Sequence, residues 1–184
     1  MPRLTAVPLD SVRLRLEPLR IEHAEAASTA LADERLHTWI GDRPADADEL
    51  RARYTRQSRG RSDDGTQDWL NWIVRDRASA AIAGTVQATV HRARRSAEVA
   101  WVVAVPFQGR GIATEAAATM IDWLRSSPTH RVEVVIAHLH PEHHASIGVA
   151  RHLGLHPTEV VVDGEVRWAS TPPGRNEHGR SSPG

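Results

Sequence analysis

The 184-residue chain contains no cysteine and no lysine, and it carries no net charge. Without cysteine it can form neither disulfides nor thiolate metal sites, which is compatible with a reducing compartment. Without lysine it cannot supply the side chain that a Walker phosphate-binding loop requires. The 23 basic side chains balance 23 acidic ones. No global electrostatic field therefore draws the protein to nucleic acid or to an anionic membrane, and we expect neither as a partner.

Long apolar runs are also missing. The first 16 residues lack the apolar core of a signal peptide, and no later run has the length of a membrane span. We therefore expect a cytoplasmic protein. A hydrophobic content of 40% over this length fits one globular domain, expected over residues 1–170. The end, 171–184, is rich in proline and glycine and is predicted to be a disordered tail.

Residues 99–126 organise the rest of the chain. Val99–Val105 is a valine-rich run typical of a buried strand, and an alanine-rich helix follows a short turn. Gly109 and Gly111 allow that turn to be sharp and leave its amide groups bare. Because the amino end of a helix attracts anions, this stretch predicts a phosphate cradle. The dinucleotide fingerprint G-x-G-x-x-G fails at Thr114, which makes Rossmann binding a weak alternative.

The hydrophobic patterns elsewhere predict a mixed α/β (α+β) fold. Strands that form an antiparallel meander are expected before residue 99, and the strand, helix, strand passage after it implies a parallel pair. The dipeptide Asp163-Gly164 predicts a tight hairpin near the end. The expected strands are 12–16, 68–75, 81–90, 99–105, 132–137, 158–162 and 165–168, and the expected helices are 20–31, 33–40, 45–57, the alanine-rich segment up to 126, and 143–152.

Two segments resemble the motifs of the GCN5-related N-acetyltransferase (GNAT) superfamily. Gln108, Gly111 and Ala113 are in register with motif A, Q/R-x-x-G-x-G/A. Residues 140–155 resemble motif B, in which Ser146 matches while His143 replaces the usual asparagine. The surrounding residues are similar to the branch that contains RimJ and RimL. This resemblance implies a mixed, mostly antiparallel sheet that splays open and is flanked by helices, acetyl-CoA as co-substrate, an amine acceptor, and a homodimer.

The resemblance also implies where the coenzyme lies. Its pyrophosphate would meet the amides of 109–114, and its pantetheine arm would lie in the splay near Val103. An imidazole at position 143 can donate one hydrogen bond as an amide does, but it titrates near neutrality, so coenzyme affinity is expected to depend on pH. The residues expected to bind the coenzyme are Trp101, Val102, Val103, Gln108, Gly109, Arg110, Gly111, Ile112, Ala113, Thr114, His143 and Ser146.

Acetyl transfer to an amine needs a base and a proton donor. We predict Glu98 as the base, with Glu133 and Glu165 as weaker candidates; the plain alternative is a solvated carboxylate at a strand end. The motif B tyrosine that many family members use as acid is replaced by Ala150. Ser146 is the expected proton donor, unless it contacts only the pantetheine arm.

The first two helices are expected to form one wall of the acceptor site, which Trp39, Trp72 and Trp101 are predicted to line. Histidines also crowd residues 138–156 and raise the alternative of a metal site. Since motif B already explains their placement, we expect no metal. The leading hypothesis is an N-acetyltransferase that moves the acetyl group of acetyl-CoA directly to a primary amine, on a small molecule or a protein N-terminus. The alternative is a catalytically degenerate CoA-binding sensor or interaction module.

Overall fold

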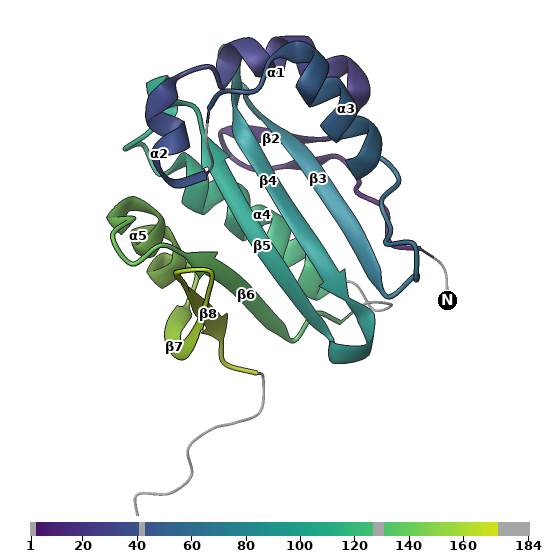
Figure 1. Cartoon of the computed structure of the whole chain (residues 1–184), viewed down its shortest axis with the longest axis vertical. Coiled ribbons are helices and arrows are strands. Elements are labelled where there is room, and N and C mark those ends of the chain that lie inside the picture. Colours follow the sequence, from purple (N-terminus) through teal and green to yellow (C-terminus); the bar gives the residue numbers. More distant parts are fainter. Residues whose placement is uncertain (1–2, 41–42, 127–130, 173–184) are drawn as a thin grey trace, which may run out of the picture.

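An open, twisted sheet forms the centre of the molecule and carries helices on both faces (Figure 1). The computed structural model describes residues 3–40, 43–126 and 131–172. Within these residues the sheet has eight strands, in the order β1-β2-β3-β4-β5-β6-β8-β7. The mixed fold class is confirmed. All but the first two residues of the predicted disordered tail, 171–184, lie outside the described residues.

The elements follow the predicted order, with one short strand added at the start. The strands are β1 Leu9–Asp10, β2 Leu14–Pro18, β3 Gln67–Asp76, β4 Ile82–His91, β5 Ser96–Val103, β6 Val134–Leu139, β7 Leu155–Val162 and β8 Glu165–Ser170. The α-helices are α1 Ala24–Ala30, α2 His37–Ile40, α3 Ala47–Gln57, α4 Ile112–Ser126 and α5 His144–His152. Short 3-10 turns are η1 Ile21–His23, η2 Glu34–Leu36, η3 Arg92–Arg94 and η4 Val105–Phe107.

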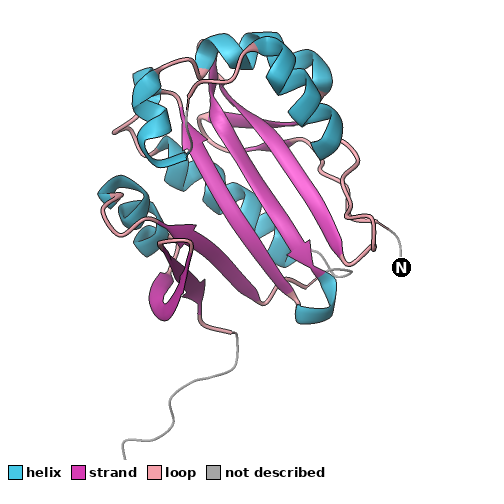
Figure 2. Cartoon of the chain, viewed as in Figure 1, coloured by secondary structure: helices cyan, strands magenta, loops and turns pink. Residues whose placement is uncertain are grey.

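The sheet splits between β5 and β6, as Figure 2 shows. Strands β1 to β5 form an antiparallel meander. The parallel pairing of β5 with β6 covers only Ser96–Glu98 against Val134–Ile136, and β6 pairs with β8 along its other edge. The predicted parallel pair and the predicted splay are therefore confirmed. The backbone of β5 beyond Glu98 faces the opening between the two halves of the sheet.

The two faces of the sheet are covered by different helices. Helix α4 lies behind the sheet in Figure 1 and buries a stripe at helical spacing that includes Ala116, Met120 and Leu124. These side chains belong to the main core. On the opposite face, Ala27 of α1 and Tyr54 of α3 belong to a second core with Ile73 and Ile82 of the sheet. Strands β3 and β4 are thus packed on both faces.

Gly84 of β4 sets the position of the end of β5. A Cβ atom added to this glycine would lie 2.0 Å from the carbonyl oxygen of Val102 and 3.0 Å from Cα of Val103. Such a contact is shorter than van der Waals separation, so only glycine allows the two backbones to approach this closely. The interruption at Gly84 that the sequence shows is therefore a packing requirement of the splayed strand.

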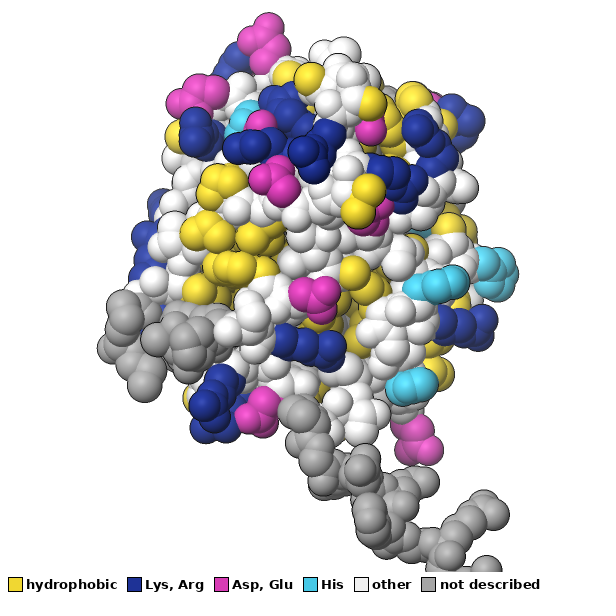
Figure 3. Space-filling view, turned by 180° about the vertical axis from the view of Figure 1, so that it is seen from behind, with side chains coloured by type: hydrophobic (Ala, Val, Ile, Leu, Met, Phe, Trp, Pro, Cys, Tyr) yellow, Lys and Arg dark blue, Asp and Glu magenta, His cyan; other side chains and the backbone are white. Residues whose placement is uncertain are grey.

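The surface behind the sheet carries both signs of charge. Figure 3 shows arginine and acidic side chains interspersed over this face, which agrees with the absence of net charge in the sequence. Histidines gather along the edge where Figure 1 places α5. Among the described residues, no helix combines the length and the apolar character that crossing a bilayer requires.

Candidate active site

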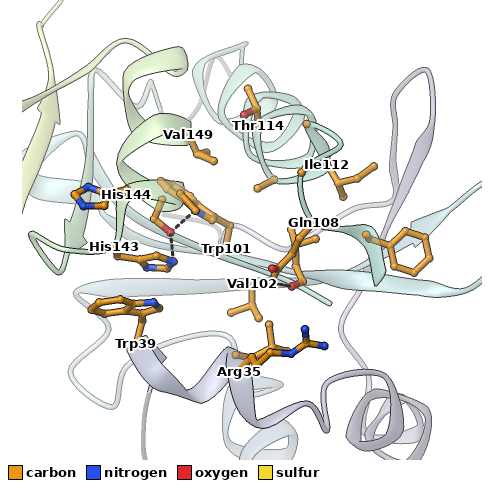
Figure 4. Close-up of a pocket in the computed structure, with 18 of the residues that line it drawn as sticks. Arg35, Trp39, Trp101, Val102, Gln108, Ile112, Thr114, His143, His144 and Val149 are labelled. Carbon is orange, nitrogen blue, oxygen red and sulfur yellow. Dashed lines mark hydrogen bonds between the residues drawn. The ribbon is translucent and has the colours of Figure 1, made fainter. Parts of the chain in front are cut away.

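A cavity of about 530 Å³ occupies the splay. The end of β5 forms its floor, and the turn before α4 with the first residues of that helix forms one side. The other walls come from the start of α5 and from η2 and α2, as Figure 4 shows. The volume lies within the usual range for ligand and cofactor sites.

The turn before α4 exposes its backbone to this cavity. Gly109 and Gly111 both have positive φ, +70° and +74°, a conformation that residues with a side chain rarely adopt. A Cβ at Gly109 would have no neighbour within 4 Å, so the space beside it is open. Because α4 begins at Ile112, the unpaired N–H groups of its first turn add to those of the glycines. This is an arrangement suited to a diphosphate.

Arg13 braces this turn from behind. Its guanidinium donates to the carbonyl oxygen of Arg110 at 2.9 Å and to a carboxylate oxygen of Glu115 at 2.6 Å. Ser11 also donates to Glu115, at 2.7 Å. Partial burial raises the pKa of Glu115, but the hydrogen bonds from Ser11 and Arg13 outweigh it and hold the pKa below its ordinary value. The residues just before β2 therefore fix the cradle to the first turn of α4.

A second group of contacts lies at the α5 side of the cavity. The indole N–H of Trp101 donates to Oγ of Ser146 at 3.3 Å, and the same oxygen lies 3.4 Å from Nε2 of His143 (Figure 4). The ring of His143 stacks on Trp39, with centroids 5.2 Å apart and planes at 11°. Burial, and secondarily the charge of His140, lowers the pKa of His143. The imidazole is therefore neutral at neutral pH, with one nitrogen free to accept.

Most residues predicted for the coenzyme line this cavity. Arg110 is the exception: its carbonyl accepts from Arg13, and its guanidinium lies 5.6 Å from the centre of the Phe107 ring. Gln108 does line the cavity and donates to the carbonyl oxygen of Val103 at 3.0 Å. The predicted residues found in the lining are Trp101, Val102, Val103, Gln108, Gly109, Gly111, Ile112, Ala113, Thr114, His143 and Ser146.

The sequence did not indicate several other lining residues. Arg35 and Leu36 come from η2, whose start is capped by the side chain of Asp33. They reach the site only because the segment 34–40 folds against the splay, which no local pattern reveals. The remaining unpredicted lining residues are Phe107, Glu142, His144, Ala145 and Val149.

A second cavity of about 340 Å³ lies between the sheet and the helices of residues 24–57, on the face opposite α4. It meets the first cavity at Leu36, Trp101 and Val102, which line both. Its walls combine apolar side chains with a set of polar ones: Ser28, His37, Arg53, Tyr54, Gln57, Asn71, Thr85 and Gln87. Two molecules bound in the two cavities would meet at the end of β5.

The three tryptophans predicted for the acceptor lie in different surroundings. Trp39 lines the first cavity and Trp101 lines both. Trp72 also lines the second cavity, but it is fully buried in the main core, where its N–H donates to the carbonyl oxygen of Val7 at 2.8 Å and its ring meets Trp123 edge-on.

The predicted base lies away from both cavities. Glu98 is on β5 near the closed end of the splay, and its carboxylate lies 3.2 Å from Nε2 of His91. It is not among the described residues that line either cavity. Of the weaker candidates, Glu133 pairs with Arg95 at 2.6 Å. Among the described residues, no group of three histidine, aspartate or glutamate side chains converges as a metal site would require.

Comparison with known proteins identifies the family of this arrangement. The family model described as "Acetyltransferase (GNAT) domain" matches residues 13–156. No curated protein sequence matches the chain.

Solved structures match over most of the chain, at identities that establish the fold alone. The ribosomal-protein-S5-alanine acetyltransferase from Vibrio fischeri is 16% identical, with a TM-score of 0.72 over 92% of this chain and 98% of that one. RimL, a ribosomal L7/L12 alpha-N-protein acetyltransferase solved with coenzyme A, is 14% identical, with a TM-score of 0.70 over 89% and 97%. The microcin C7 self-immunity acetyltransferase MccE, solved with acetyl-CoA and AMP, is 14% identical, with a TM-score of 0.72 over 87% and 93%.

Proposed function

Because the chain belongs to the GNAT family of acyl-CoA-dependent N-acyltransferases, we propose that it transfers the acetyl group of acetyl-CoA to a primary amine within a ternary complex. One observation carries this proposal: the glycine turn, the end of β5 and the Trp101–Ser146–His143 contacts all face one cavity in the splay. The resemblance to the RimJ and RimL branch is supported by the presence of such enzymes among the structures that share the fold.

The residues of the first cavity fit coenzyme A. The bare amides of Gly109 and Gly111 and the amino end of α4 would hold the diphosphate, since these groups donate hydrogen bonds without an intervening side chain. The end of β5 at Val102 and Val103, which lines the cavity, would hold the pantetheine arm. When bound, acetyl-CoA supplies an acetyl group on a thioester sulfur.

Ser146 is suited to serve the leaving sulfur. Transfer forms a bond from the amine nitrogen to the acetyl carbon and breaks the bond from that carbon to sulfur, so the nitrogen loses a proton and the sulfur gains one. Water would take the proton from the nitrogen, and water would return a proton to the hydroxyl that has served the sulfur. The indole of Trp101 occupies one lone pair of Ser146 Oγ. In the tautomer of His143 that carries its hydrogen on Nε2, the imidazole would occupy the other, which leaves the hydroxyl hydrogen available for the sulfur. We therefore assign Ser146 as the proton donor in place of the tyrosine that Ala150 replaces. His143, within reach of the same oxygen, would orient that hydroxyl.

Alignment of the two reactants supplies much of the acceleration in such a reaction. The junction of the two cavities at Trp101 and Val102 is the place where a thioester and an amine would meet. Glu98 as base stays a prediction. Because it lies outside both linings, we propose no direct proton transfer from the amine to its carboxylate, and the Glu98→Gln variant tests a role through water.

Two measurements test the proposal. Isothermal calorimetry should detect acetyl-CoA binding to the wild-type protein, and release of free thiol in the presence of a panel of amines should show turnover. Binding without turnover of any amine would favour the alternative, a CoA-binding sensor or interaction module. Failure to bind acetyl-CoA would contradict both.

A further inference from the structure

The second cavity has a distinct charge. Among the described residues that line it, none is an aspartate or a glutamate, whereas Arg53 contributes a permanent positive charge. Glu49, one helical turn before Arg53, is engaged by Arg43 in an ion pair that lowers its pKa. The cavity is therefore neutral to positive along the walls that the structure describes.

Helix α3 presents one face to this cavity. Leu50, Arg53, Tyr54 and Gln57 line it and recur at spacings of three and four residues, which places them along one side of the helix. Burial raises the pKa of Tyr54, so its phenol keeps its proton at neutral pH and remains a hydrogen-bond donor. Leu50 on this face would contact the apolar part of a bound ligand, and Arg53 and Tyr54 would donate hydrogen bonds to a ligand group that accepts them.

Two buried polar atoms in the lining lack partners. Nε2 of His37 and Oε1 of Gln57 make no hydrogen bond within the described part of the chain. Buried polar groups are nearly always satisfied, and an unsatisfied one in a cavity points to a missing ligand or water. His37 is adjacent to Leu36, which lies at the junction with the first cavity. Both unsatisfied atoms thus belong to residues that line the second cavity.

We propose that the second cavity is the acceptor site and that it selects a primary amine joined by an apolar body to a carboxylate. The inference rests on the proposed function and adds the class of acceptor. Its amine would lie at the junction with the first cavity, close to His37, and its carboxylate would accept hydrogen bonds from Arg53. Oε1 of Gln57 is an acceptor, so it would take its hydrogen bond from a water that also donates to the carboxylate. A polycation would bring ammonium groups that no described lining residue can neutralise, at a desolvation cost.

Matched acceptors test this inference with the wild-type protein. Thiol release from acetyl-CoA is measured with two ω-amino carboxylates, aminohexanoate and aminooctanoate, with their amides, and with spermidine. We expect kcat/KM for each amino carboxylate to exceed that of its amide by about tenfold, the size of one charged hydrogen bond, and to exceed that of spermidine. A preference for the amides or for spermidine, or no turnover of either amino carboxylate while acetyl-CoA binds, overturns the inference and leaves coenzyme binding intact.

Substitution of Arg53 tests whether this residue causes the preference for a carboxylate. In Arg53→Gln we expect kcat/KM for the amino carboxylates to fall about tenfold and that for the amides to fall by less, because an amide accepts a hydrogen bond from the arginine but carries no charge, while the affinity for acetyl-CoA stays unchanged. Arg56→Gln is the matched control, because Arg56 is exposed on the same helix and does not line the cavity. An equal loss for carboxylates and amides, or no loss at all, contradicts the assignment. If the wild-type protein did not bind acetyl-CoA, that result would instead contradict the proposed function.

Discussion

Replacement of Gly84 by alanine should change the geometry of the active site, although Gly84 does not line the first cavity. The added Cβ would lie 2.0 Å from the carbonyl oxygen of Val102, so the two must separate by about 1 Å even to reach the tightest contact that real structures show. Both neighbours are backbone and cannot rotate away. We expect the end of β5 to be displaced from its position in the floor of the first cavity.

The size of the effect follows from this displacement. Overpacking of this kind costs about 1–3 kcal/mol of the free energy of unfolding, which for a chain of this length lowers Tm by roughly 3–10 °C. A 1 Å shift of the strand that would hold the pantetheine arm should also reduce kcat by as much as about 100-fold. Thermal unfolding, calorimetry with CoA and thiol-release kinetics measure the three quantities.

A second glycine provides the control. Gly148 lies within α5, and a Cβ there would have no neighbour within 4 Å. Gly148→Ala should therefore raise stability by about 0.5–1 kcal/mol through helix propensity and leave CoA affinity unchanged. If Gly84→Ala retained wild-type Tm and CoA affinity, the close approach of β4 and β5 would not determine the geometry of the site.

Three further predictions concern charged groups. Arg13→Gln should weaken CoA binding by about tenfold without unfolding the protein, because it frees the cradle from Glu115, and calorimetry with circular dichroism checks both effects. Because the pKa of His143 is lowered in the native state, the unfolded chain binds a proton at this residue more readily than the native state does. The free energy of unfolding should therefore decline as the pH falls below the ordinary value of 6.5. CoA affinity should decline over the same range, since the coenzyme would cover the ring. His143→Asn should remove that part of the pH dependence. Urea titrations and CoA calorimetry of both proteins at pH 8 and pH 5.5 test this, and an equal change between the two pH values in both proteins would contradict it. Asp68→Asn should lower the free energy of unfolding by about 3 kcal/mol in a urea titration, because Asp68 is fully buried against Arg92; a change below about 1 kcal/mol would show that this buried pair is dispensable.

Local patterns predicted the elements well because hydrophobic periodicity and turn chemistry act over few residues. The hairpin at Asp163-Gly164 is confirmed, with both residues at positive φ, 50° and 84°. The glycine turn before α4 follows from its two glycines in the same way. By contrast, β1 has only two residues, too few for alternation to be visible.

The parts that sequence reasoning missed depend on tertiary contacts. The second cavity joins side chains of α3 to residues of three later strands, β3, β4 and β5, and no short window of sequence contains them all. Glu98 was predicted as base from its place on the central strand, but its contact with His91 depends on the register of β4 against β5. The arginine brace of the cradle likewise links residues about a hundred positions apart, 13 with 115.

The central claim is that bare amides before α4 hold the diphosphate of the coenzyme. Calorimetry of acetyl-CoA with Gly111→Asp and Gly111→Asn tests it most directly, since the two side chains have the same size and share the strain of a positive φ of +74°. We expect the aspartate variant to bind at least about tenfold more weakly than the asparagine variant, because only its side chain adds a negative charge beside the phosphates. Equal affinities for the two variants would contradict the account.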